Sequence, residues 1–211
     1  MNLIEIRCPS GSLAPADRAA LAADVVHGLV GDQMVGEVPE ETLRRAQAMT
    51  HVAFSELAGW TTGSGRWQPG EAAPLWITVT VPEMWREEMS PYVIGWLRTA
   101  VHQLDERRGW RRATGDLWIN ITGVADRSIG LDGRPATADD VLAVMTKEFR
   151  ARAEGAATDL PDGMVIDPMC GMKVRLGKGA ITLEQDGAVL GFCAQNCRDA
   201  YARREGIALP V

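Results

Sequence analysis

The sequence predicts an α+β protein in which two βαβ units precede a small cysteine-rich domain. Residues 3–9 align with residues 76–82, and both segments alternate apolar and polar residues, as half-buried strands do. A helical pattern and a second strand pattern follow each segment. Three of the four cysteines, Cys170, Cys193 and Cys197, lie near the carboxyl end. The sequence therefore predicts two domains, a larger βαβ domain and a small cysteine-rich domain.

The first βαβ unit covers about residues 1–70. Its expected elements are, in chain order, a strand over 3–9, a helix over 15–30, a short helix over 39–48 and a strand over 50–56. Leu21, Val25 and Leu29 recur on one face of the first helix, and Pro15 suits its first turn.

The second βαβ unit covers about residues 71–153. Its expected elements are a strand over 76–82, a helix over 91–108, a strand over 116–122 and a closing helix over 138–153. The apolar stripe of the long helix consists of Ile94, Leu97, Val101 and Leu104. Two βαβ units predict paired parallel strands joined by helical crossovers.

The expected domains are therefore residues 1–153 and residues 164–211, joined by a linker over residues 154–163 that is rich in Gly, Ala, Asp and Pro. The net charge of −6 argues against a nucleic-acid partner, which requires a basic face. No apolar run is long enough to cross a membrane, and no signal peptide is recognisable. These features predict a cytoplasmic protein with reduced thiols.

The carboxyl-terminal cysteines have the spacing Cys-x22-Cys-x3-Cys. Asp186-Gly187 predicts a tight hairpin turn between them. Cys193 follows the second strand of this hairpin, and Cys197 lies four residues on, at the start of a helix. This step places both sulfurs on one side of a helical turn. Cys170 precedes a glycine, which allows the backbone to fold sharply around an ion.

A soft metal ion explains this pattern better than the alternatives. The segment is too short to fold on apolar burial alone, and thiolates select Zn(II), Cu(I) or iron–sulfur chemistry. A disulfide would leave one of the three cysteines unpaired, and an iron–sulfur cluster normally takes four. Three buried cysteines that act as small hydrophobes are the remaining alternative. Three thiolates suit Cu(I), whereas zinc would need a fourth ligand, with Asp167 or water as candidates. The fourth cysteine, Cys8, shares a strand face with Ile4 and is expected in the core.

The Asp-Pro-x-Cys-Gly-Met opening at residues 167–172, the hairpin and the Phe-Cys-x3-Cys ending at residues 192–197 resemble the YHS domain, a relative of the TRASH metal-sensing domains. The resemblance implies a treble-clef-like fold that binds copper, zinc or another heavy metal through cysteines. Leu190 and Gly191 stand where family members often carry an aromatic pair. Asn196 stands where histidine is common. These departures leave the identity of the metal open.

The tandem βαβ layout, together with the turn at residues 59–63, resembles the tautomerase superfamily in its fused, 4-oxalocrotonate-tautomerase form. This resemblance implies a four-stranded sheet with helices on one face, a homo-oligomer that is commonly a trimer, and an active site around an amino-terminal proline. Here Asn2 follows the initiator, so the chain is expected to retain Met1 and its primary amine, with a pKa near 8. Glu5 and His51 are the other candidates for acid–base catalysis.

Three functions follow from these features. The first is a soft-metal-binding protein that holds copper or zinc through three cysteines on a tautomerase-like scaffold that works without proline chemistry. The second is an isomerase acting on a keto, enol or unsaturated carboxylic acid, with the metal domain structural or covering the site. The third makes the metal itself catalytic. The sequence does not decide whether the chain is an enzyme.

Overall fold

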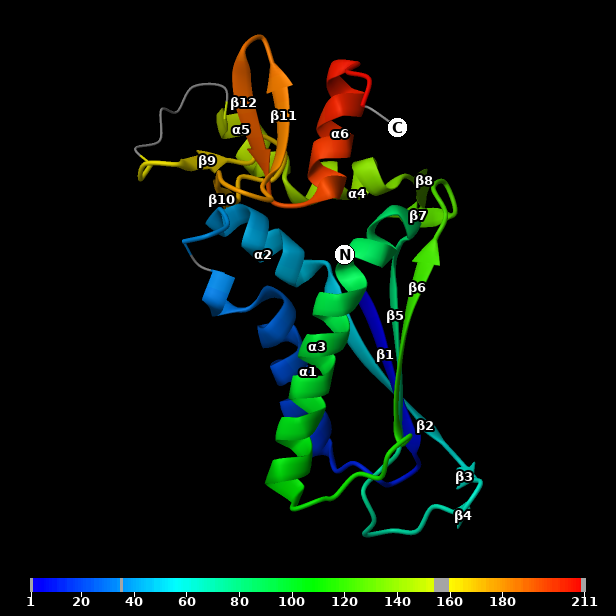
Figure 1. The fold of residues 1–211 in the computed structure, drawn as a ribbon. Helices are drawn as coiled ribbons and strands as arrows, with labels where there is room; N and C mark the ends of the chain where they lie inside the picture. Colours follow the sequence, from blue (N-terminus) through cyan, green and yellow to red (C-terminus); the bar gives the residue numbers. More distant parts are fainter. Residues whose placement is uncertain (1, 35, 154–159, 210–211) are drawn as a thin grey trace. The chain divides into compact units, whose positions relative to one another are not determined.

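The computed structural model describes residues 2–34, 36–153 and 160–209 (Figure 1). The chain forms two compact units. The first unit comprises Met1–Gly31 and Thr50–Val124, and the second unit comprises Asp32–Met49 and Ala125–Val211. Each unit therefore consists of two separate segments of the chain.

This division differs from the boundaries expected from the sequence. Residues 32–49 and 125–153 belong to the second unit, together with the cysteine-rich segment, and not to the βαβ units. Of the expected linker over residues 154–163, residues 154–159 lie outside the described part of the chain.

The first unit contains a four-stranded sheet with the order β2-β1-β5-β6. Its strands are β1 (Asn2–Pro9), β2 (Thr50–Leu57), β5 (Leu75–Pro82) and β6 (Leu117–Val124). β1 and β2 are parallel, β5 and β6 are parallel, and the central pair of β1 and β5 is antiparallel. The prediction of an α+β fold with a four-stranded sheet from two βαβ units is confirmed.

Helices α1 (Pro15–Val30) and α3 (Glu83–Arg108) lie side by side on one face of this sheet (Figure 1). Alternation along the strands sends Ile4, Ile6 and Cys8 into the core beneath the helices, where their exposure is at most 2%. Leu21 and Val25 of α1 are buried against them, as the apolar stripe predicted. The opposite face of the sheet carries the alternate residues of each strand. A short hairpin of β3 (Thr61–Thr62) and β4 (Gly65–Arg66) follows β2.

The long helix begins earlier than the sequence predicted. α3 starts at Glu83 and includes Pro91, whereas the sequence pattern suggested a start at Pro91. A proline inside a helix removes one backbone hydrogen bond and costs about 3 kcal/mol. The additional turns compensate because they bury Trp85 and pack Met89 against the core of the unit. Ile94, predicted on the buried stripe, is 40% exposed, and Val93 is buried instead.

The second unit is built from short elements (Figure 1). In chain order they are η1 (Asp32–Met34), α2 (Glu40–Ala48), β7 (Ile129–Leu131), β8 (Arg134–Ala136), α4 (Ala138–Met145), α5 (Lys147–Ala153), β9 (Met164–Ile166), β10 (Lys173–Arg175), β11 (Ile181–Gln185), β12 (Ala188–Phe192) and α6 (Gln195–Glu205). The expected helix over 138–153 is divided at Thr146, whose hydroxyl donates to the carbonyl of Leu142 at 2.8 Å.

β11 and β12 form the predicted hairpin. Asp186 and Gly187 both have positive φ, at 53° and 79°, which is the backbone that a tight two-residue turn requires. α6 packs on this hairpin through the rings of Phe192 and Tyr201, whose centroids are 5.5 Å apart. The Tyr201 hydroxyl donates to the Gln185 side chain at 2.6 Å. A two-stranded ribbon, a hairpin and a helix therefore surround the cysteine-bearing loops.

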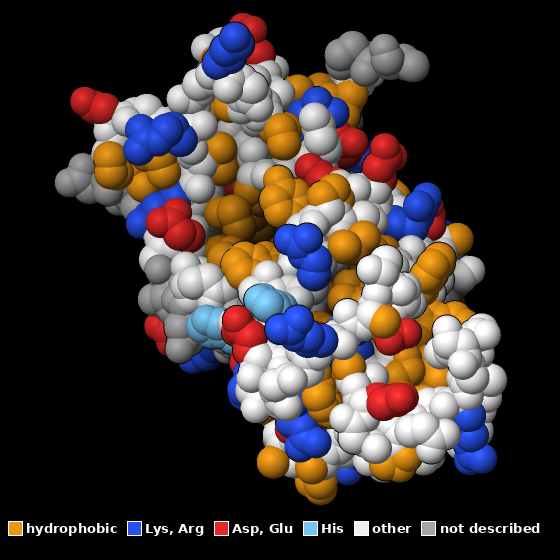
Figure 2. All heavy atoms as spheres, turned by 60° about the horizontal axis from the view of Figure 1, so that its bottom comes forward, with side chains coloured by type: hydrophobic (Ala, Val, Ile, Leu, Met, Phe, Trp, Pro, Cys, Tyr) orange, Lys and Arg blue, Asp and Glu red, His pale blue; other side chains and the backbone are white. Residues whose placement is uncertain are grey.

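No helix in the described part of the chain is long and apolar enough to cross a membrane. Figure 2 shows acidic and basic side chains interspersed over the face it presents, rather than separated into two surfaces.

Candidate metal centre

Three cysteines from different places in the second unit converge on one point. Cys170 lies in the loop between β9 and β10, Cys193 directly follows β12, and Cys197 is in the first turn of α6. The Sγ atoms of Cys170 and Cys193 are 3.5 Å apart, and those of Cys193 and Cys197 are 3.7 Å apart. Together with a carboxylate oxygen of Asp167, the ligand atoms all lie within 4.8 Å of one another.

These separations fit a single soft metal ion. Four tetrahedral metal–sulfur bonds of about 2.3 Å would place neighbouring sulfurs about 3.8 Å apart. All three thiols are free, and Cys170 and Cys197 are buried. The sequence therefore identified a set of side chains that the fold brings together, and their binding of a metal stays a prediction.

The loop that carries Cys170 depends on the residue after it. Gly171 has φ of 81°, in the left-handed region that side chains with a Cβ rarely adopt. Its Cα faces Pro39 before α2 and the ring of Phe149 on α5, so that an added Cβ would meet the ring at 2.7 Å. The amide of Lys173, two residues on, donates to the carbonyl of Glu37 at 2.9 Å. The Cys170 loop is therefore supported by Phe149 on α5 and by Glu37 and Pro39, which precede it by more than a hundred residues in the sequence.

Asp167 connects the two cysteine-bearing segments. Its side chain is fully buried. One carboxylate oxygen accepts the backbone N–H groups of Met169 at 2.8 Å and Cys170 at 3.3 Å, and the other accepts the N–H of Cys193 at 2.9 Å. The sequence suggested Asp167 as a fourth ligand. In the structure its oxygens lie in the cluster and also hold the Cys170 loop to the Cys193 loop.

The cluster perturbs the protonation of its own members. Hydrogen bonds from Cys193 and Cys197 lower the pKa of Cys170 well below its usual value. The same contacts with Cys170 raise the pKa values of Cys193 and Cys197. Burial raises the pKa of Asp167 to about 6, with a further contribution from the nearby Cys170. A cation bound among these thiols would lower their pKa values, because it stabilises the thiolate form.

Arg150 is a cation near the cluster that the sequence pattern did not single out. From α5, its Nε lies 3.4 Å from the carbonyl oxygen of Met169, and its Nη2 lies 3.9 Å from the Met169 sulfur. Burial lowers the pKa of Arg150, and the negative charge of Cys197 and Cys170 acts in the opposite direction. No spacing rule relates α5 to the cysteines, so only the packing of the second unit could reveal this residue.

The candidates for acid–base catalysis lie in the first unit. Met1 is outside the described residues. Glu5 pairs with Arg7 at 2.6 Å and accepts the hydroxyl of Ser55 at 2.8 Å, and the hydrogen bond from Arg7 lowers the pKa of Glu5. His51 is exposed and lies opposite Leu3 on the neighbouring strand. Glu5 and His51 share the open face of the sheet, and the ion pair makes Glu5 a weaker base.

No family model matches the chain, and no curated protein matches it. Among solved structures, the chain is similar to one described as native fused 4-OT, with 17% identity and a TM-score of 0.47, over 66% of this chain and 98% of that one. It is also similar to the R7 fused 4-OT wild type asymmetric trimer, at 16% identity and a TM-score of 0.47, with the same coverage. Macrophage migration inhibitory factor of Toxoplasma gondii has 16% identity and a TM-score of 0.40, over 63% of this chain and 98% of its own. The fold described above is established by the chain's own sheet order and register.

Proposed function

We propose that this protein binds a thiophilic metal ion, copper or zinc, through Cys170, Cys193 and Cys197. The observation that supports the proposal is the convergence of three sulfurs and one buried carboxylate within 4.8 Å. Thiolates are soft ligands that favour Cu(I) and Zn(II) over hard cations. Asp167 orients the ligand loops, and it or water is available as a fourth ligand for zinc. In this proposal the carboxyl-terminal domain is a metal-binding domain of the YHS type on a tautomerase-like scaffold.

Three further residues support the proposal of such a site. Gly171 lets the Cys170 loop turn, Asp167 ties this loop to Cys193, and Arg150 supplies positive charge beside the thiolates. Metal uptake displaces protons, because each bound cysteine must ionise. Acid is therefore expected to release the ion.

The proposal predicts that replacing any one of the three cysteines by serine lowers metal affinity at least about 100-fold. Removing a ligand should cost no less than removing a group that only supports a ligand, which costs about 10–100-fold. The measurement is a competition titration of the protein with Cu(I) and, separately, with Zn(II), in the presence of a chromophoric chelator. Metal content of protein purified without chelator is measured alongside.

The matched control is Cys8→Ala. Cys8 is also a buried, free thiol, but it lies in the core of the first unit. This variant should keep the affinity and stoichiometry of the wild-type protein. Equal affinities for wild-type protein and a Cys170→Ser variant would contradict the proposal.

We also propose that the chain forms a homo-oligomer, with a trimer expected from the family resemblance, through the open face of its sheet. The large apolar side chains exposed on this face include Leu3 (44%), Trp76 (43%) and Trp118 (61%). Trp76 and Trp118 are paired on neighbouring strands, and the guanidinium of Arg7 lies over the Trp76 ring at 5.4 Å. An exposed pair of aromatic rings on neighbouring strands supports the proposal of an interface at this face.

Trp118→Lys is expected to convert the oligomer to a monomer, because it places a charge where the copies would bury an aromatic ring. Sedimentation velocity measures the change in mass. Tyr92→Lys is the control, since Tyr92 is 71% exposed but lies on α3. A monomeric wild-type protein would contradict the proposal.

A further inference from the structure

We propose that the second unit contains a separate binding pocket for a small carboxylic acid with an apolar body. The pocket has a volume of about 640 Å³ and opens to solvent. Volumes of this size are typical of sites for small organic ligands. Its walls come from residues 36–39, helices α2 and α5, and the strands that flank the Cys170 loop. This inference goes beyond metal binding and does not require it.

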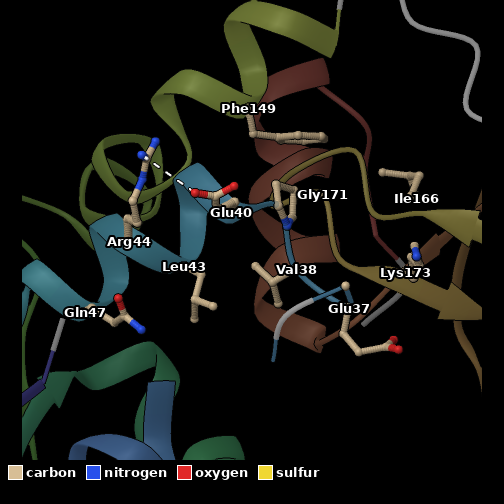
Figure 3. Close-up of a pocket in the computed structure, with 12 residues that line it drawn as sticks. Glu37, Val38, Glu40, Leu43, Arg44, Gln47, Phe149, Ile166, Gly171 and Lys173 are labelled. Carbon is tan, nitrogen blue, oxygen red and sulfur yellow. Dashed lines mark ion pairs between the residues drawn. The ribbon is translucent and has the colours of Figure 1, made fainter. Parts of the chain in front are cut away.

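The interior of the pocket is apolar. Figure 3 shows Val38 and Leu43 pointing toward its centre, with the ring of Phe149 on the opposite side. Ile166 lies at the side formed by β9. A ligand placed here would exchange water for contact with aliphatic and aromatic side chains, which is favourable in proportion to the apolar area covered.

Charged groups line the rim. Lys173 and Arg44 supply positive charge, and Glu37 and Glu40 supply negative charge. Arg44 pairs with Glu40 one turn away at 3.9 Å. The ammonium group of Lys173 has no hydrogen bond or ion pair within the described part of the chain. In Figure 3 the carboxylate of Glu37 extends away from Val38 and Leu43. Lys173 is therefore the rim group best placed to receive an anion.

The chemical class follows from this combination. An apolar body fits the interior, and one carboxylate pairs with Lys173 at the mouth. A polar interior would favour a sugar, and a cluster of unpaired arginines would favour a phosphate. A single flexible ammonium beside an apolar chamber favours a monocarboxylate.

The test uses two probes of the same shape, 3-phenylpropionate and its uncharged amide, 3-phenylpropionamide. Each is titrated into the full-length wild-type protein at millimolar concentration while backbone and methyl resonances are recorded by NMR. Shifts are expected at Val38, Leu43 and Phe149, with the acid binding about threefold more tightly than the amide, as one exposed ion pair provides. Shifts that map elsewhere, absence of binding, or equal binding of the two probes would overturn the proposal.

Two variants complete the test. Lys173→Met is expected to abolish the preference for the acid, while Lys178→Met, an exposed lysine outside the pocket, leaves it unchanged. Val38→Trp fills the chamber and is expected to weaken both probes at least about tenfold. A preference that survives Lys173→Met would overturn the role of Lys173. Undiminished binding by folded Val38→Trp protein would overturn the location.

Discussion

Asp167→Asn is expected to destabilise the second unit by about 3 kcal/mol and to lower metal affinity about 10–100-fold. The carboxylate of Asp167 is fully buried and accepts three backbone N–H groups, from Met169, Cys170 and Cys193. An amide can present its oxygen to one side only, and its NH₂ group would then face an N–H donor on the other. A buried donor without an acceptor costs about 1–3 kcal/mol.

Amide hydrogen exchange read by mass spectrometry measures this effect within residues 160–209. Tryptophan fluorescence serves as an internal reference, because all seven tryptophans lie between residues 60 and 118 of the first unit. Asp186→Asn is the control. Asp186 occupies a turn position with φ of 53°, which asparagine tolerates, so its change should stay within about 0.5 kcal/mol. Unchanged exchange in Asp167→Asn would show that the three hydrogen bonds do not hold the loops.

Gly171→Ala is expected to destabilise the second unit by about 3 kcal/mol or more and to weaken metal binding with it. Two costs act together. An alanine at φ of 81° is strained, and its Cβ would overlap Pro39 and the ring of Phe149. Pro39 cannot give way easily, because its ring is fixed to the backbone.

Gly177→Ala provides the comparison for this change. A Cβ at Gly177 would meet nothing within 4 Å, and its φ is not in the left-handed range. Urea denaturation followed by far-UV circular dichroism, with the metal titration repeated on each variant, separates the two positions. If Gly171→Ala behaved like Gly177→Ala, the tight packing around the Cys170 loop would have no energetic importance.

The sequence contained the information for the elements whose signal is local. Alternation in residues 3–9 and 76–82 predicted half-buried strands, and Asp186-Gly187 predicted the hairpin turn. The spacing of Cys193 and Cys197 predicted that their sulfurs lie on one side of a helical turn. Each of these inferences uses only residues that are neighbours along the chain.

The features that the sequence pattern did not predict depend on packing between residues far apart in the chain. The start of α3 at Glu83 could not be read from a pattern that contains Pro91, because the compensating burial of Trp85 is a tertiary effect. The structural role of Asp167 required the positions of backbone N–H groups from two loops. Periodicity likewise could not assign residues 32–49 to the second unit. It indicates that one face of a helix is buried but not which element covers that face.

Because α2 belongs to the second unit, a carboxyl-terminal fragment that omits α2 lacks part of that unit. The chain leaves the first unit at residue 31, returns to it at residue 50 and leaves it again after residue 124. A fragment starting at residue 164 would lack the carbonyl of Glu37 and the rings of Pro39 and Phe149, on which the Cys170 loop rests. The cysteine-rich segment therefore depends on residues outside it, and a graft onto another protein would have to include α2 and α5.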